Sequence, residues 1–227
     1  MIDSKNINCD LVIRATGIVV KNSSITGRIV SNVSTGSVTV EDSLINGGQQ
    51  ETFPTVSYQN LTLRRVEVIG GQHSVQCHSR CTVLDSWLHN QYLPSSSNGH
   101  VNAFISNGGS GFLLRHNTLH CTVAPTAAGG CTANASLFGD FGPISDATFD
   151  RNLFKARSDG ASFCLDAGYN PNKPYGSNPS GVVVTNNTFE RGTNGKCGIY
   201  GPFAFFLKSP TNIWTGNIWS DGTALLN

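Results

Sequence analysis

A nine-residue pattern recurs along this chain and constrains its fold more than any other feature. The clearest copies are GFLLRHNTL (111–119), DATFDRNLF (146–154), GVVVTNNTF (181–189) and TNIWTGNIW (211–219), and weaker copies precede them. Each copy alternates apolar and polar residues as a strand does, then places a small polar residue two positions before a large apolar one. Aligned on that position, the column reads Ser23, Ser43, Val66, Ser86, Asn117, Asn152, Asn187 and Asn217. Gaps of 20 to 35 residues between copies are typical of a solenoid.

The spacing of the column predicts how the whole chain is organised. A unit this short buries its apolar side chains only against the units before and after it, as in a stacked coil. We therefore expect one all-β solenoid domain of about eight rungs across residues 1–227. Loop insertions lengthen rungs four to seven, and such loops often gather on a binding face; they are 91–99, 122–130, 169–180 and 193–196.

Charge and cysteine content narrow the classes of function. The chain has 15 basic and 14 acidic residues, so no basic patch indicates nucleic acid and no polybasic segment indicates a membrane. Seven cysteines in so polar a chain favour an oxidising compartment, and we expect a secreted or extracellular protein.

The N-terminal end has its own expectation. Met1 is followed by a β-like repeat rather than a signal-peptide pattern, which suggests a truncated or trimmed N-terminus. The first rung also lacks a recognisable cap. Because an uncapped solenoid end exposes unpaired strand edges, we expect upstream residues, a partner subunit or self-association to cover it.

The four asparagines of the column predict a structural ladder rather than a catalytic group. Amides stacked at the strand spacing of roughly 4.8 Å can hydrogen-bond to one another and to the backbone of a corner. The stretch GFLLRHNTL is then scaffold, although it contains Arg115 and His116. The strand before it in the same rung is the better candidate for chemistry.

Several segments together give the chain a family resemblance. The repeats VVVTNNTF, LLRHNTL and TFDRNLF occur with an H-x-[DN]-[GA]-[FI] strand at 100–104 and the segment LFGDFGPIS at 137–145. In these features the chain resembles the pectate-lyase-like superfamily, and more narrowly its secreted bacterial members. The resemblance covers essentially the whole chain and implies a single-stranded, right-handed parallel β-helix. It implies no single activity, because this fold carries lyases, hydrolases, esterases, epimerases and non-catalytic modules.

Two aspartates are the first candidates for chemistry. Asp140 and Asp166 follow equivalent strands, and aligning the small residues after those strands places them in one column with Ser106. Adjacent strands would hold the two carboxylates roughly 5 Å apart. There they could share a proton, hold a cation, or act as acid and nucleophile in glycoside cleavage. The competing interpretation is that each aspartate caps a glycine-containing corner.

His100 is expected to act as the catalytic acid or base. Histidine is the usual general base near neutral pH, and the resemblance places His100 at the start of the motif-bearing strand. Asn102 could hold a substrate hydroxyl or carboxylate, and His73 begins the corresponding strand one rung earlier. The alternative is that His100 is a corner histidine bonded to backbone.

The remaining candidates would bind substrate. Lyases of the resembled fold often combine a Lys or Arg base with calcium held by acidic residues. The cations near the loop-rich segments are Lys155, Arg157 and Lys173, and Tyr169 lies in a loop where a sugar ring could stack. The sequence requires no cofactor. Calcium is possible, although few acids accompany the two aspartates.

The cysteines favour disulfides over a metal site. His73, Cys77, His78 and Cys81 could be read as a zinc site. Strand alternation, however, places His73 and Cys77 on one face and His78 on the other. A disulfide across the corner is the better interpretation. The expected pairs, whose connectivity the sequence leaves open, are Cys77–Cys81, Cys121–Cys131 and Cys164–Cys197, with Cys9 left over.

These features lead to one main expectation and two alternatives. We expect a protein that cleaves an extracellular polysaccharide in a groove built by rungs four to seven. A polysaccharide lyase is slightly favoured over a glycoside hydrolase, by resemblance alone. The alternatives are a non-catalytic glycan-binding or adhesive module and a structural spacer. Glycan cleavage and glycan retention distinguish the three.

Overall fold

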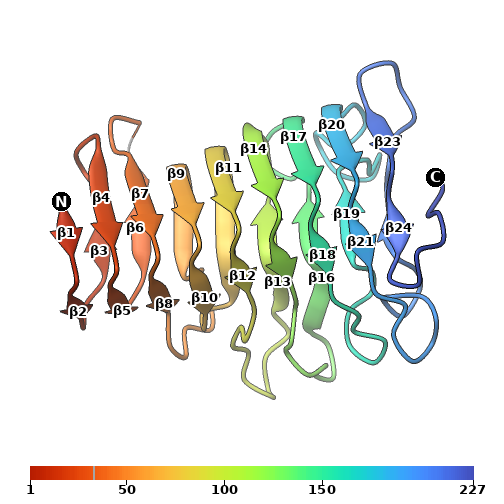
Figure 1. The fold of residues 1–227 in the computed structure, drawn as a ribbon. Coiled ribbons are helices and arrows are strands. Elements are labelled where there is room, and N and C mark those ends of the chain that lie inside the picture. Colours follow the sequence, from red (N-terminus) through yellow and green to blue (C-terminus); the bar gives the residue numbers. More distant parts are fainter. Residues whose placement is uncertain (33) are drawn as a thin grey trace.

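A computed structural model describes residues 1–32 and 34–227. These residues form strands, turns and loops and contain no helix. The strands stand side by side in long parallel ladders from one end of the molecule to the other (Figure 1). The architecture is therefore all-β and consistent with a parallel β-helix. Nothing within the described ranges is a helix of the length and hydrophobicity needed to cross a membrane.

Two sets of strands carry the repeat motif on either side of its polar corner. The strands before the corner, called the first series, are β1 (Ile2–Asp3), β4 (Ile18–Lys21), β7 (Val38–Glu41), β9 (Val56–Arg64), β11 (His73–Leu84), β14 (Gly109–Arg115), β17 (Ile144–Asp150), β20 (Ser180–Thr185) and β23 (Ile213–Thr215). The strands after the corner form a separate sheet, made of β2 (Asn6–Ile7), β5 (Ser24–Thr26), β8 (Leu44–Asn46), β10 (Glu67–Ile69), β12 (Trp87–Leu88), β15 (Thr118–Leu119), β18 (Leu153–Phe154), β21 (Thr188–Phe189) and β24 (Ile218–Trp219).

A further set, called the second series, precedes the motif strands. It consists of β3 (Leu11–Val12), β6 (Ile29–Ser31), the first halves of β9 and β11, β13 (His100–Ser106), β16 (Gly130–Leu137), β19 (Leu165–Ala167) and β22 (Phe203–Ala204). The long strands β9 and β11 run through both series and join them into one sheet. All three sets pair in parallel from copy to copy.

The asparagine ladder lies at the corner after the first series. Asn117 donates an amide hydrogen bond to Asn152 (2.9 Å), Asn152 to Asn187 (3.0 Å), and Asn187 to Asn217 (2.9 Å). Each of the first three also donates its backbone N–H to the amide oxygen of the next. All four side chains are buried. The predicted structural ladder is therefore confirmed.

The residue just before each ladder position makes the corner. Its φ lies between 49° and 57° at the non-glycine members Asn22, Asp42, Arg65, Asp85, His116, Arg151 and Asn186. This left-handed conformation turns the chain sharply between two strands. His116 consequently lies exposed on the surface, where it contacts Asp85 at 2.7 Å.

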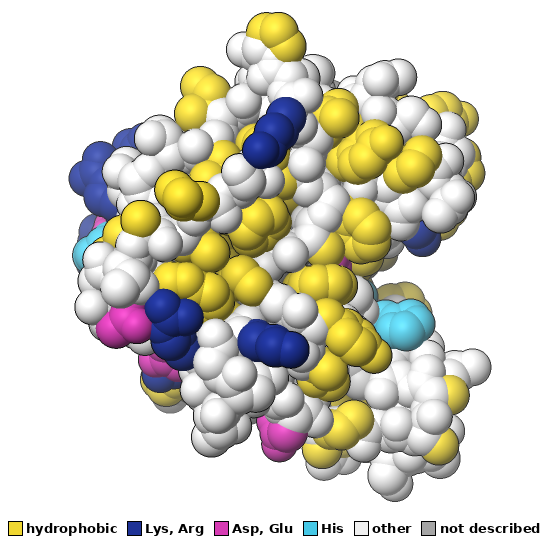
Figure 2. Space-filling model, turned by 90° about the vertical axis from the view of Figure 1, so that its right-hand side faces the viewer, with side chains coloured by type: hydrophobic (Ala, Val, Ile, Leu, Met, Phe, Trp, Pro, Cys, Tyr) yellow, Lys and Arg dark blue, Asp and Glu magenta, His cyan; other side chains and the backbone are white. Residues whose placement is uncertain are grey.

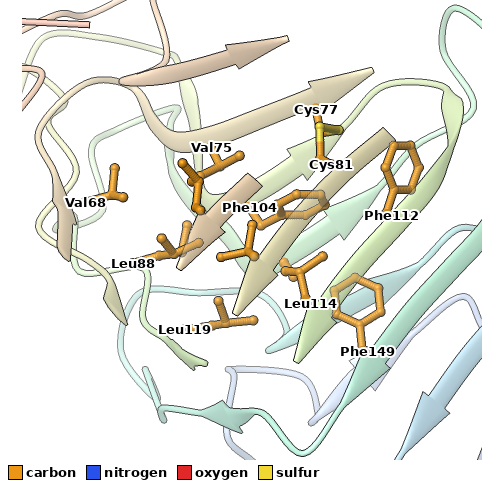
Figure 3. Packing of buried hydrophobic residues seen from close by; sticks show 14 of the residues in the cluster. Val68, Val75, Cys77, Cys81, Leu88, Phe104, Phe112, Leu114, Leu119 and Phe149 are labelled. Atoms are coloured by element: carbon orange, nitrogen blue, oxygen red, sulfur yellow. A yellow bond between two sulfur atoms is a disulfide. The ribbon is translucent and has the colours of Figure 1, made fainter. Parts of the chain in front are cut away.

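The core is a stack of inward side chains between the sheets. Phe104 packs edge-on against Phe112 and Phe149, and Phe154 stacks on Phe189 with ring centroids 4.5 Å apart. Figure 3 shows the rings of Phe104, Phe112 and Phe149 and the neighbouring leucines projecting from successive strands into one interior. Burying each large apolar side chain contributes roughly 1.5–3 kcal/mol. Stability therefore accumulates along the stack rather than at one centre.

Disulfides crosslink the chain within this core and beside it. In the described part of the chain the pairs are Cys77–Cys81, Cys121–Cys131 and Cys164–Cys197, which matches the predicted pairing. Cys9 is exposed and bonds to none of the other cysteines. Disulfides of this kind indicate an oxidising environment. The zinc interpretation is wrong, because Cys77 and Cys81 bond to each other.

Candidate functional site

One face of the second series carries a row of residues at equivalent positions on successive strands. The strand register aligns Gln76, Ile105, Ser136, Asp166 and Ala204, one residue from each successive strand. We call this row the outer column. Most of its neighbours in sequence belong to the hydrophobic core, so alternation directs the column away from the core, although Ile105, Ser136 and Asp166 are themselves buried.

A cavity of about 460 Å³, called the central pocket, opens on this face. It gathers residues from four separate segments of the chain. They are Gln72, His73, His100, Ile105, Asn107, Thr132, Phe138, Asp140 and Lys173. The pocket therefore brings together four predicted site residues: His73, His100, Asp140 and Lys173.

An ion pair forms one wall of the central pocket. Lys173 Nζ lies 2.7 Å from Asp140 Oδ1, and the ammonium also sits 5.2 Å from the centre of the Phe138 ring. Asp140 belongs to the turn after β16, and Lys173 to the connection between β19 and β20. The carboxylate balances the ammonium charge and holds it beside the cavity. Both side chains remain partly accessible.

Two histidines, one exposed and one buried, also line the central pocket. His100 is exposed at the start of β13, and its carbonyl accepts a hydrogen bond from Gln72 Nε2 at 3.0 Å. His73 is buried, and its Nδ1 accepts the backbone N–H of Asn102 at 3.1 Å. Burial, assisted by neighbouring His100, lowers the pKa of the His73 imidazole to about 3. His73 is therefore a neutral acceptor, whereas the exposed His100 side chain is open to a ligand.

A buried hydrogen-bonded chain lies behind the pocket wall. Asn102 Nδ2 donates to Ser136 Oγ at 2.7 Å, and Ser136 Oγ donates to Asp166 Oδ2 at 2.8 Å. Burial raises the pKa of Asp166 to about 7, although the hydrogen bond from Ser136 opposes the shift. The amide oxygen of Asn102 has no hydrogen-bond partner among the described residues. Asn102 and Asp166 therefore support the pocket from inside.

The predicted column of Ser106, Asp140 and Asp166 is wrong. Ser106 instead pairs with Leu137, and Leu137 with Ala167. Asp140 lies three residues beyond Leu137, in the turn after β16, and Asp166 pairs with Ser136, so neither aspartate lies in the row of Ser106. Asp140 pairs with Lys173 and Asp166 with Ser136, so the two carboxylates serve different partners.

Three other predicted binding residues lie outside the lining of the central pocket. Lys155 pairs with Glu190 at 2.5 Å. Arg157 pairs with Asp159 at 2.8 Å and also donates to the Thr122 carbonyl. Tyr169 is half-buried at the beginning of the connection that carries Lys173.

Several residues of the site escaped the sequence interpretation. Phe138 and Phe163 have the alternating pattern that is typical of core residues, but both are partly exposed, and Phe138 lines the pocket. Ser136 and Thr132 are small polar residues in a strand full of them, so the sequence offers no signal that separates them. Phe138 carried a usable signal, since it immediately follows the last residue of a strand whose inward positions are already filled.

The described residues contain no group of three or more His, Cys, Asp or Glu side chains arranged to hold a metal ion. Comparison of the chain with family models, curated proteins and solved structures found no match.

Proposed function

We propose that this chain is a secreted, right-handed parallel β-helix that binds an extracellular polysaccharide containing uronic acids and cleaves it by β-elimination. The proposal includes the fold details of the pectate-lyase-like superfamily: about eight rungs, with insertions in rungs four to seven. One observation carries the function. An accessible imidazole, His100, and an ammonium, Lys173, line the same open pocket.

The two groups match the needs of β-elimination. Lys173 would neutralise the uronate carboxylate and so make the adjacent C5 proton more acidic, while Asp140 keeps the ammonium in place. His100 would take the C5 proton as general base. The electron pair forms the C4=C5 double bond, the C4–O bond breaks, and the leaving oxygen receives a proton from the imidazolium or from water.

The carboxylates favour elimination over hydrolysis. Glycoside hydrolysis typically uses two carboxyl groups that flank the scissile bond. Here Asp140 lines the pocket but is already paired with Lys173, and Asp166 is 1% exposed. Neither is arranged as a free acid and nucleophile pair.

Cleavage of a glycan panel tests the proposal. The purified chain is incubated with uronate and neutral polysaccharides, and the ultraviolet absorbance of unsaturated ends and the release of reducing ends are followed together. We expect both signals in equal amounts for a uronate polymer. We expect His100→Ala to lower kcat/KM by at least 100-fold, the loss of a general base. His116→Asn, at an exposed corner, is the matched histidine control and should leave kcat/KM unchanged.

Other outcomes lead to different conclusions. Reducing ends without ultraviolet absorbance would show hydrolysis and reject elimination. Glycan retention without either signal would favour the alternative, a non-catalytic glycan-binding or adhesive module. The observation that favours this alternative is the Lys173–Asp140 pair, because a lysine so engaged can bind a uronate without catalysis.

Two further expectations remain predictions. Calcium could bridge a uronate to the protein, and a chelator would then abolish cleavage in a way that added calcium restores. Self-association would use the edges of β1, β2 and β3, which pair with later strands on one side. Sedimentation of the purified chain would reveal it.

A further inference from the structure

Three aromatic rings gather beyond the central pocket, at the far end of the second series. Phe163 lies 5.9 Å from Tyr200 and 6.3 Å from Phe205, measured between ring centroids. Tyr200 is 70% exposed and Phe205 42% exposed. We call these three residues the aromatic platform. An exposed aromatic cluster of this kind needs an explanation, because burying the same rings would stabilise the fold.

The platform is held in place by its backbone. Cys164, directly after Phe163, is bonded to Cys197, and the Tyr200 N–H donates to the Ser162 carbonyl at 3.0 Å. The two segments approach so closely that a Cβ on Gly198 would lie 2.6 Å from the Phe163 Cα. Glycine is therefore required there. The rings are presented by a fixed scaffold, which lowers the entropy cost of binding.

Phe205 adds a separate observation. Its φ is 63°, in the left-handed region that bulky side chains disfavour. It does not belong to the corner column before the asparagine ladder, where such angles build the coil. Unfavourable backbone conformations that the surrounding structure enforces cluster at ligand-binding sites. Here the conformation leaves the ring exposed beside Phe163.

Two backbone hydrogen bonds connect the platform to segments that carry residues of the central pocket. The Phe163 N–H donates to the carbonyl of Thr132, a pocket residue, at 3.1 Å. The Phe205 carbonyl accepts from the Tyr169 N–H at 2.8 Å, and Tyr169 begins the connection that carries Lys173. Since β22 lies three strands beyond β13, the platform is about 15 Å from the start of the pocket along the coil.

The pocket continues in the opposite direction as well. A second cavity of about 260 Å³ shares Asn107 with the central pocket and is bordered by Gln76, His78 and Phe141. Phe141 is 79% exposed, and its N–H donates to the Asn107 carbonyl at 2.8 Å. Figure 2 looks at the molecule from the β23–β24 end and shows a notch on one side, with hydrophobic side chains and a histidine at its walls.

We propose that one glycan chain lies across the second series through both cavities, with sugar rings stacked on Phe141 at one end and on Tyr200 and Phe205 at the other. This inference rests on the proposed function, because a polymer cleaved in the central pocket must leave it in both directions along the surface. A sugar ring presents a face of C–H bonds, which packs on a flat aromatic ring, while its hydroxyls remain hydrated. The alternating aromatic and polar lining fits such a ligand.

The dependence of binding on oligosaccharide length tests this track. Uronate oligosaccharides from disaccharide to octasaccharide are titrated into the intact chain by calorimetry. We expect the affinity to rise until the ligand spans from the central pocket to the platform. Tyr200→Ala and Phe141→Ala should each weaken binding of the octasaccharide about 10-fold and leave the disaccharide unchanged. Tyr200→Phe, which retains the ring, should bind like the original chain.

The matched control is Trp87→Ala, an exposed aromatic on β12 in the other sheet, which should change neither affinity. An affinity that stops rising at the disaccharide, or Tyr200→Ala and Phe141→Ala behaving like Trp87→Ala, would refute the track while leaving cleavage in the pocket intact. Length-dependent binding without cleavage would retain the track and reject elimination. Absence of binding at every length would reject both proposals.

Discussion

At the scale of single residues, the molecule buries two titratable groups whose pKa values move in opposite directions. Asp166 is held as a hydrogen-bond acceptor for Ser136, and burial raises its pKa to about 7. His73 accepts from the Asn102 backbone, and burial lowers its pKa to about 3. In both cases the fold favours the neutral form. The two groups therefore impose opposite pH dependences on stability.

Each dependence follows from the protons bound in the folded and unfolded states. The raised pKa of Asp166 gives a contribution to stability that is complete below pH 3.8 and is lost as pH rises to about 7. The lowered pKa of His73 gives a contribution that is complete above pH 6.5 and is lost as pH falls to about 3. Between about pH 4 and 6.5 the two slopes oppose each other.

Replacing either group should leave only the other group's effect on how stability changes with pH. We expect Asp166→Asn to make the melting temperature rise from about pH 4 to 6.5, and His73→Gln to make it fall from about pH 4 to 7. Scanning calorimetry across this range measures both. Glu51→Gln, at an exposed position, is the control and should retain the original profile. Profiles of Asp166→Asn and His73→Gln that coincide would contradict the opposing shifts.

Single residues also show how much of the candidate site could be predicted from the sequence. His100 and Lys173 were predicted from a motif and from a loop, and the structure places them at one pocket. The facing pair of Asp140 and Asp166 was wrong because β16 ends at Leu137: Asp140 lies in the following turn, whereas Asp166 pairs with Ser136 within the strands. The end of a strand leaves no trace in the apolar alternation when small polar residues surround it. The point at which each strand ends is therefore a part of a solenoid that the repeats alone do not determine.

At the scale of elements, the asparagine ladder explains why the corner is regular. Asn152 illustrates its connections: the amide oxygen accepts from both Asn117 nitrogens, and Nδ2 donates to the Leu114 carbonyl at 2.9 Å as well as to Asn187. This pattern was predictable, because the same residue type recurs at one position of every late copy. In three of the four earlier copies serine takes the place, and Ser43 Oγ accepts the Ser23 N–H at 3.0 Å; the fourth has Val66.

Interrupting the ladder should destabilise the fold strongly. Asn152→Ala would leave the Asn117 backbone N–H buried without a partner. It would also remove one of the two acceptors of Asn117 Nδ2 and the side-chain donor to the Leu114 carbonyl, at about 1–3 kcal/mol for an unsatisfied group. We expect a loss of at least about 3 kcal/mol in the free energy of unfolding, measured by urea denaturation. Asn152→Ser should lose less, since a hydroxyl can still accept the Asn117 N–H.

An exposed asparagine serves as the control that separates the loss of the ladder from the general effect of replacing an asparagine by alanine. Asn172 lies exposed in a turn between β19 and β20. We expect Asn172→Ala to change the free energy of unfolding by less than about 0.5 kcal/mol, as surface substitutions usually do. Equal losses for Asn152→Ala and Asn172→Ala would show that the ladder contributes nothing beyond an ordinary surface position.

At the scale of the whole molecule, each copy of the repeat contacts only the copies before and after it along the coil. Segments that lie far apart in the sequence are therefore connected by stacking and by disulfide bonds. Cys164 and Cys197 join segments 33 residues apart, whereas Cys77 and Cys81 are 4 apart. In the chain-entropy account, a crosslink stabilises more when it closes a longer loop of the unfolded chain. The former pair also fixes the aromatic platform, while the latter closes a corner of β11.

The two crosslinks should therefore differ in both stability and binding. Replacing Cys164 and Cys197 together by serine should cost about 4 kcal/mol, and replacing Cys77 and Cys81 together about 2 kcal/mol. Thermal and urea unfolding of the two double variants measures the difference.

The binding experiment is done in conditions where both variants remain folded. We expect the Cys164–Cys197 variant to lose affinity for long uronate oligosaccharides, because the disulfide no longer holds the aromatic platform. The same variant should retain its affinity for the disaccharide, because the central pocket does not contain this disulfide. Equal stability losses would argue against the entropic account, and unchanged binding of long ligands would show that the Cys164–Cys197 bond does not position the platform.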